Sequence, residues 1–140
     1  MIEIEFDRDT DFDTDREHKS MSKTILVADD AESVREIICN TLSIFGYSMV
    51  EARDGVMALE KLQSENFDLL ITDVDMPGMT GLELIRRMRK EQNLAKLPVI
   101  VITAEDRDIR AEVREIASAV MRKPFSPAEL LELVASIFKS

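Results

Sequence analysis

The sequence lacks the residues that several classes of protein require. Cys39 is the only cysteine among 140 residues, which excludes an intrachain disulfide and a thiolate metal cluster. Because Cys39 lies in an apolar helical pattern, we interpret it as a packing residue. No apolar run approaches the roughly 20 residues that a membrane-spanning helix needs, and the acidic start does not resemble a signal peptide. We therefore expect no membrane insertion and a cytoplasmic protein.

Positive charge is scarce as well. The chain has 18 lysines and arginines against 28 acidic residues, a net charge of −10. A protein that binds nucleic acid needs clustered basic residues to displace counterions from phosphates, so we expect no nucleic-acid partner. The hydrophobic share of 45% and the charged share of 33% are ordinary for a globular protein, and the length suits one domain.

The acidic residues gather at the start of the chain. Residues 1–20 contain eight acidic and three basic residues, a net charge of −5. Such a segment repels itself, so we predict that residues 1–22 form a solvated extension, native or foreign, before a domain of residues 23–140. Ile2, Ile4 and Phe6 alternate with acids, which leaves a short added strand open. We expect His18 to be solvated and not a phosphodonor.

From residue 23 onward, short apolar runs alternate with helical patterns. The runs of strand length are Thr24–Ala28, Ser48–Ala52, Asp68–Thr72, Pro98–Thr103 and Ala119–Arg122. We expect the first, third and fourth runs to be buried on both faces, as in the middle of a parallel sheet. Successive strand–helix units predict an α/β fold with a five-stranded parallel sheet, doubly wound, with helices on both faces and right-handed crossovers.

Apolar residues at helical spacing follow each predicted strand, and we expect them to face the core. In chain order they are Val34, Ile37, Ile38, Thr41 and Phe45; Val56, Leu59 and Leu62; Leu82, Leu84, Ile85 and Met88; Ile109, Val113 and Ile116; and Leu130, Leu131, Val134 and Ile137. Gly46 can end the first helix because glycine accepts the left-handed conformation, and the second helix follows Asp54. The last helix begins with a predicted capping box, with Ser126 as N-cap, Pro127 next and Glu129 closing the box.

Polar residues stand at the carboxyl ends of four of the predicted strands. Asp29 and Asp30 follow the first strand, Asp73 the third, Thr103 ends the fourth, and Lys123 follows the fifth. A parallel sheet brings these ends together, where two carboxylates 4 Å apart repel by about 4 kcal/mol at an effective dielectric of 20. A cation would remove this cost, and oxygen ligands favour Mg²⁺ or Mn²⁺. The pattern therefore indicates phosphoryl chemistry, although each residue alone could equally cap a helix, close a strand or lie on the surface.

Four stretches of the sequence carry a resemblance to a known family. They are Ile25-Leu-Val-Ala-Asp-Asp30, Leu69-Leu-Ile-Thr-Asp73-Val-Asp-Met-Pro77-Gly-Met-Thr-Gly81, Val101-Ile-Thr-Ala104 and Lys123-Pro-Phe125. In combination they resemble the response-regulator receiver domain of two-component systems, in particular its stand-alone chemotaxis-type members. The resemblance covers residues 23–139 and implies a flavodoxin-like (βα)5 fold.

The resemblance implies a phosphoacceptor and a metal site. Asp73 matches the residue whose carboxylate attacks the phosphohistidine of a sensor histidine kinase or histidine phosphotransfer protein, forming an acyl phosphate. Asp30, Asp73 and the main-chain carbonyl of Asp75 match the Mg²⁺ ligands, and Asp29 would act through metal-bound water.

The resemblance also implies a switch. Thr103, the Ala104 N–H and Lys123 would bind phosphoryl oxygens, and Lys123–Pro124 would be a cis peptide. Phosphorylation would then change the face formed by the fourth helix, fifth strand and fifth helix, where a downstream protein binds. Such a protein would be a monomer or a phosphorylation-dependent dimer.

The sequence departs from the family where the signal leaves the site. Val120 stands where the family usually has an aromatic switch residue, and Ile116-Ala117 replaces the Gly-Ala that commonly ends the fourth helix. We therefore expect the fourth helix to be short or displaced. Asp75 and Glu105, both acidic, are expected to alter the rate at which the acyl phosphate hydrolyses.

Two other functions stay open. Asp73-Val-Asp75 resembles the nucleophile motif of haloacid-dehalogenase-type phosphatases, but Met76-Pro77 replaces the expected threonine-bearing continuation, and the chain has no cap insert. The other alternative is a receiver-fold binding module that is never phosphorylated. We favour the hypothesis that the protein is a phosphoryl acceptor and not a turnover enzyme.

Overall fold

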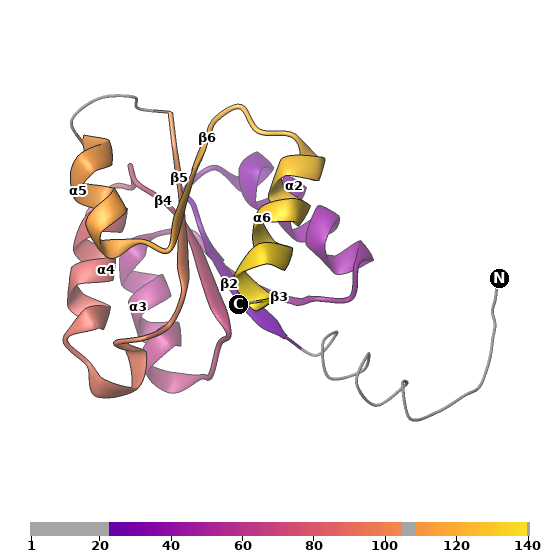
Figure 1. Cartoon of the computed structure of the whole chain (residues 1–140). Helices are drawn as coiled ribbons and strands as arrows, with labels where there is room; N and C mark the ends of the chain where they lie inside the picture. Colours follow the sequence, from indigo (N-terminus) through magenta and orange to yellow (C-terminus); the bar gives the residue numbers. More distant parts are fainter. Residues whose placement is uncertain (1–22, 105–108, 140) are drawn as a thin grey trace, which may run out of the picture.

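The structure is a computed structural model that describes residues 23–104 and 109–139. Strands and helices alternate through this part of the chain (Figure 1). In order, they are β2 (Thr24–Ala28), α2 (Glu32–Ile44), β3 (Ser48–Ala52), α3 (Gly55–Ser64), β4 (Leu69–Asp73), α4 (Gly81–Arg89), the 3-10 helix η1 (Gln92–Leu94), β5 (Val99–Thr103), α5 (Ile109–Ile116), β6 (Ala119–Arg122) and α6 (Pro127–Lys139). The predictions for the acidic extension, its added strand and His18 lie outside the described residues. None of the described helices is long and apolar enough to cross a membrane.

The five strands form one sheet in the order β3-β2-β4-β5-β6, and every neighbouring pair is parallel. Helices α3, α4 and α5 cover one face of this sheet, while α2 and α6 cover the other (Figure 1). The predicted doubly wound α/β fold is therefore confirmed. The carboxyl ends of the strands lie together at the upper edge of the sheet in Figure 1.

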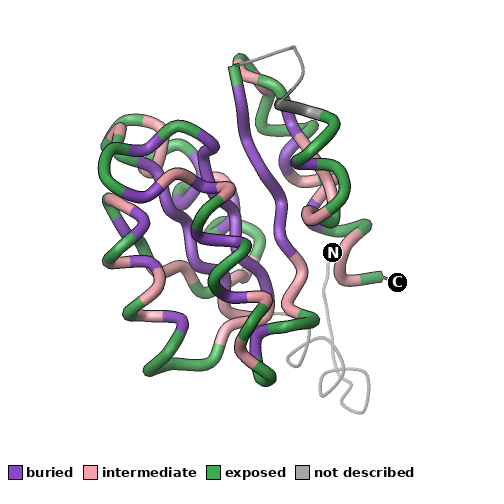
Figure 2. Tube along the Cα trace, turned by 90° about the vertical axis from the view of Figure 1, so that its left-hand side faces the viewer, coloured by how far each residue is buried: buried purple, intermediate pink, exposed green. Residues whose placement is uncertain are grey.

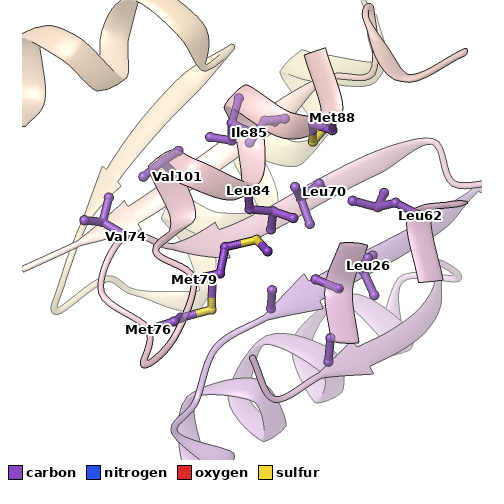
Figure 3. Close-up of a cluster of buried hydrophobic side chains, with 14 of the residues drawn as sticks. Leu26, Leu62, Leu70, Val74, Met76, Met79, Leu84, Ile85, Met88 and Val101 are labelled. Atoms are coloured by element: carbon purple, nitrogen blue, oxygen red, sulfur yellow. The ribbon is translucent and has the colours of Figure 1, made fainter. Parts of the chain in front are cut away.

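The central strands supply side chains to both hydrophobic layers. Strands β2, β4 and β5 are buried almost throughout, as predicted for strands covered on both faces (Figure 2). Leu26 and Leu70 point into the layer under α3, α4 and α5 (Figure 3), whereas Ile25 and Ile71 point into the layer under α2 and α6. The alternation follows from the two-residue period of a strand, and it anchors the strand ends in a close-packed frame.

Local signals fix the ends of several helices. The N–H of Gly46 donates to Ser43 O and that of Tyr47 to Leu42 O, and Gly46 has φ of 95°. This is a Schellman motif, which ends α2 as the sequence predicts. Asp54 accepts from the Met57 N–H and caps α3.

Capping boxes begin two further helices. The predicted box of α6 is present, with Ser126 and Glu129 exchanging bonds of 2.9 and 3.1 Å. The structure shows a second box, between Thr80 and Glu83, at the start of α4. The Thr-x-x-Glu spacing was present in the sequence and could have revealed it.

Three residues that we expected in the core are exposed. Ile37 is 51%, Phe45 58% and Val56 52% exposed. The buried stripe of α2 consists instead of Ile38, Cys39 and Leu42. Two stripes of helical period can be drawn through α2, and packing against the sheet and α6 selects the one that includes Leu42.

The buried stripe of α3 is made of Gly55, Ala58 and Leu62, so Val56 lies on the outer side. A Cβ at Gly55 would lie 2.7 Å from Met79 O, which shows how closely α3 approaches the loop before α4. Cys39 packs in the core as expected. Its burial and the Glu51 charge raise the pKa of its thiol to about 11, which keeps the thiol neutral.

Candidate functional site

The structure brings the predicted polar residues to one edge of the sheet. Asp73 is the last residue of β4, one position later than the predicted end of that strand. Asp29 and Asp30 follow β2, Thr103 ends β5, and Lys123 follows β6. Carboxylate oxygens of Asp29, Asp30 and Asp73 all lie within 4.8 Å of one another. Three carboxylates therefore converge, as expected from the parallel strand order.

Asp29 is held by several hydrogen bonds. It is only 1% exposed, and its Oδ1 accepts from the Ala31 N–H at 2.8 Å. Its own N–H donates to Ala52 O at 3.2 Å, and its carbonyl accepts from Arg35 Nη1 at 2.7 Å. The N-cap of α2 is Ala31, without a side-chain bond, so neither aspartate caps this helix. The alternative that the pair only caps a helix is not what the structure shows.

Asp73 lies in an unfavourable environment for a carboxylate. It is 6% exposed, and its Oδ1 accepts from the Asp75 N–H at a long 3.4 Å. Burial, followed by the charge of Asp29, raises the pKa of Asp73, while the neighbouring Lys123 acts in the opposite direction. The ionised carboxylate is thus only partly compensated, and a bound cation would stabilise it.

Lys123 supplies the positive charge of the site. Its Nζ lies 3.4 Å from Asp29 Oδ2 and 3.5 Å from Asp73 Oδ2. The main-chain N–H of Lys123 donates to Thr103 O at 2.9 Å, and this bond joins the ends of β5 and β6. The Lys123–Pro124 bond is cis, as the resemblance implies. The ammonium bridges two carboxylates and is not a surface charge.

The remaining predicted residues surround this centre. Thr103 is 2% exposed, and Ala104 and Asp75 are exposed at the rim. Glu105 lies outside the described residues, so the proposed tuning of hydrolysis stays a prediction. Val120 is half-buried in β6 and packs against the layer that contains α5. The predicted fourth helix is α5, and its described part spans eight residues. Its displacement relative to the family also stays a prediction.

Glycine allows the loop after β4 to fold beneath Asp73. The N–H of Gly81 donates to Val74 O at 2.8 Å. A Cβ at Gly81 would overlap the carbonyl oxygen of Asp73, so any other residue would push α4 away from Asp73. Met76 and Met79 of the same loop extend into the hydrophobic layer (Figure 3). This anchoring positions the residues around Asp73.

Two charged residues near the site were missed by the sequence reasoning. Arg35 of α2 donates to the Asp29 carbonyl and, through Nε, to Glu51 Oε1 of β3 at 2.9 Å. Neither residue belongs to one of the recognised motifs. An arginine six positions after the first aspartate, on the first turns of the helix, was the only signal available.

The sequence matches a known protein family and several known proteins. The response regulator receiver domain family matches residues 25–135. The chain is 42% identical over 120 residues to the chemotaxis protein CheY of Pseudomonas aeruginosa, covering 82% of this chain and 95% of that protein. It is 39% identical over 120 residues to the chemotaxis protein CheY-3 of Vibrio cholerae, covering 82% and 91% of the two chains.

Solved structures agree with this match. The chemotaxis response regulator CheY4 of Vibrio cholerae has a TM-score of 0.79 at 33% identity, covering 83% of this chain and 98% of that one. The response regulator TrrA of Thermotoga maritima, solved in complex with Mg²⁺-BeF, has a TM-score of 0.74 at 34% identity, with 82% and 98% covered.

Proposed function

The chain belongs to the response regulator receiver domain family, and from this premise we propose that Asp73 accepts a phosphoryl group in a Mg²⁺-dependent reaction that switches partner binding. CheY-like receivers are signalling proteins and not turnover enzymes. They pair with histidine kinases or histidine phosphotransfer proteins, which would supply the phosphoryl group. The observation that carries the proposal is the position of Asp73, buried between the Asp29 carboxylate and the Lys123 ammonium.

The donor set fits Mg²⁺. Asp30 and Asp73 would hold the cation through carboxylate oxygens, together with the main-chain carbonyl of Asp75. Both oxygens of Asp29 already face donors, the Ala31 N–H and the Lys123 ammonium, which supports a contact through water for this residue. When bound, the cation would neutralise charge on the transferring group. The Mg²⁺-BeF complex of the TrrA relative is consistent with such a site.

The chain's own residues perform the remaining steps. A carboxylate oxygen of Asp73 attacks phosphorus, the bond from phosphorus to the donor's histidine nitrogen breaks, and an acyl phosphate forms. Lys123 exchanges its contact with Asp73 for a phosphoryl oxygen, while the Thr103 hydroxyl and the Ala104 N–H bind the others. The short distance between Lys123 and Asp73 supports this exchange, because the ammonium needs to move little.

We expect phosphorylation to change the surface formed by α5, β6 and α6, which are the predicted fourth helix, fifth strand and fifth helix. A partner protein would bind to this surface. Thr103 and Lys123 lie at the strand ends that lead into this surface. A groove of about 490 Å³ runs between β6 and α6 and is lined in part by Val120, Met121 and Leu133. Without an aromatic ring at position 120, movement of α5 and β6 themselves would carry the signal to a protein bound there.

The decisive experiment incubates the protein with acetyl phosphate and Mg²⁺ and follows its intact mass. We expect the parent to gain one phosphoryl group and Asp73→Asn to gain none. Asp54→Asn is the matched control, because Asp54 also follows a strand of the same sheet and asparagine caps α3 equally well. This control should label like the parent.

Equal labelling of the parent and Asp73→Asn would refute the assignment of the acceptor. An unlabelled parent that retains its fold would favour the unphosphorylated binding module. Repeated turnover of a simple phosphate ester would favour the phosphatase.

A further inference from the structure

Arg35 occupies an unusual position for a charged residue. Only 14% of its side chain is exposed, and the guanidinium binds two acceptors on different elements. Nη1 donates to the main-chain carbonyl of Asp29 at 2.7 Å, and Nε donates to Glu51 Oε1 at 2.9 Å. The planar fork of arginine allows both bonds at once, which the single ammonium of lysine does not reproduce.

These bonds close a ring around the backbone of Asp29. The Asp29 N–H donates to Ala52 O, and Ala52 follows Glu51 in β3. Glu51 accepts from Arg35, and Arg35 returns to the carbonyl of Asp29. The main chain is therefore fixed on both sides of the residue whose carboxylate points toward Asp73, at the point where the chain leaves β2 for α2.

We propose that Arg35 is a positioning residue for the acidic site: it holds the Asp29 main chain so that the Asp29 and Asp30 carboxylates converge with Asp73 on one cation. The inference rests on the proposed Mg²⁺-dependent function. Loss of a group that orients metal ligands without touching the metal typically lowers metal affinity by roughly 10- to 100-fold. Asp30 benefits because it has an exposed side chain and depends on its backbone for its direction.

The chain contains a matched control for this role. Arg86 Nη2 lies 2.8 Å from Glu112 Oε2, so the pair is as close as Arg35 and Glu51, yet both side chains are 52% exposed. The Arg86 pair joins α4 to α5 on the outer side of the helical layer. An effect of losing a charge or an ion pair alone would appear in both pairs, whereas a positioning effect would appear only at Arg35.

The test titrates Mg²⁺ alone into 15N-labelled protein and follows the amide signals of residues 29–31. We expect Arg35→Met to weaken Mg²⁺ binding by about tenfold, the lower end of the effect typical for such orienting groups. Arg35→Lys should lie between Arg35→Met and the parent, because it can restore one of the two bonds. Arg86→Met should bind Mg²⁺ like the parent. Far-UV circular dichroism at the same temperature checks that each variant is folded.

A second measurement separates positioning from a purely structural role. The rate of labelling by acetyl phosphate is followed as a function of Mg²⁺ concentration. We expect Arg35→Met to label slowly at low Mg²⁺ and to approach the parent rate at saturating Mg²⁺, because Arg35 does not touch the phosphoryl group. Should Arg35→Met fail to fold, Glu51→Ala releases the same guanidinium and is expected to show a smaller shift in the same direction.

The outcomes distinguish this inference from the proposed function. A parent that neither binds Mg²⁺ nor becomes labelled overturns both. A parent that does both, together with Arg35→Met and Glu51→Ala variants of unchanged Mg²⁺ affinity, overturns the positioning role alone. Equal weakening in Arg35→Met and Arg86→Met would also overturn it, since the effect would then be one of net charge.

Discussion

The two ends of the sheet differ in how their charged groups are compensated. At the amino ends of β5 and β6, Arg89 donates to the carbonyls of Leu94, Ala95, Leu97 and Ile116 at 3.0, 3.1, 2.8 and 3.3 Å. At the carboxyl ends of the strands, three carboxylates lie close together. The ammonium of Lys123 contacts two of them, Asp29 at 3.4 Å and Asp73 at 3.5 Å. The charge of Arg89 is therefore surrounded by neutral acceptors. The cluster of three aspartates and Lys123, in contrast, contains more negative than positive charge.

The difference separates a structural site from a responsive one. Burial lowers the pKa of Arg89, yet the carbonyl oxygens and the negative end of α5 stabilise its charged form without any ligand. Burial and then the charge of Asp29 raise the pKa of Asp73, and Lys123 offsets this shift only in part. We therefore expect stability to be independent of ligands at one end of the sheet and to depend on a cation or a proton at the other.

The largest effect on stability is expected from Arg89→Met. The change removes the guanidinium from four carbonyls, three of them in partly buried hydrogen bonds, which should lower the free energy of unfolding by about 3 kcal/mol. Urea denaturation measures the loss, and Arg89→Lys should recover part of it. Mg²⁺ affinity of the folded variant should not change. An unchanged denaturation midpoint would contradict the structural role of this arginine.

A smaller effect is expected from Lys123→Met at the other end. Removing the ammonium leaves Asp29 and Asp73 uncompensated, which should cost about 1 kcal/mol at neutral pH, because the lysine is partly solvent-screened. In contrast to Arg89→Met, the loss should shrink when Mg²⁺ is added. Urea denaturation with and without Mg²⁺ tests this, with Lys96→Met on an exposed loop as the control. A loss that Mg²⁺ does not reduce would remove the contrast between the two ends.

The smallest effect, and the only gain, is expected from Asp73→Asn. Because the pKa of Asp73 is raised in the folded protein, the fold favours the neutral carboxyl, and stability falls as pH rises through that pKa. Asparagine resembles the neutral form. The variant should therefore melt a few degrees above the parent at neutral pH without Mg²⁺.

The pH dependence of this gain is the check. Thermal unfolding should show the advantage of Asp73→Asn disappearing at acidic pH, where the parent carboxyl is protonated as well. Added Mg²⁺ should also reduce it by stabilising the parent. A variant less stable than the parent at neutral pH, or one equally favoured at every pH, would show that Asp73 carries no such cost.

The strand pattern and the strand ends were predictable from the sequence. Continuous apolar runs identified the buried strands, and parallel order then required Asp29, Asp73 and Lys123 to meet. The helix faces were less predictable. Ile37 and Phe45 lie on one of two stripes that α2 could bury, and only packing against the sheet and α6 decides between them.

Arg35 and Arg89 could not have been predicted in the same way. Their acceptors are largely main-chain carbonyls, which every residue carries, so no side-chain type in the sequence marks the partner. Their roles depend on how α2 and α4 turn the guanidinium toward neighbouring loop backbone, and in Arg89 also toward Ile116, 27 positions along the chain. Capping boxes are the opposite case, since Thr80 and Glu83 find each other within one turn.

The contact between Lys123 and Asp29 spans 94 positions of the chain. Contacts of such sequence separation form late, because the intervening chain must first be ordered. During synthesis the three aspartates emerge before the ammonium that bridges two of them, and the site gains this ammonium only after β6 has joined β5. On the proposed function, a chain that ends before Lys123 would lack the ammonium that the phosphoryl acceptor needs, even though it already contains all three aspartates.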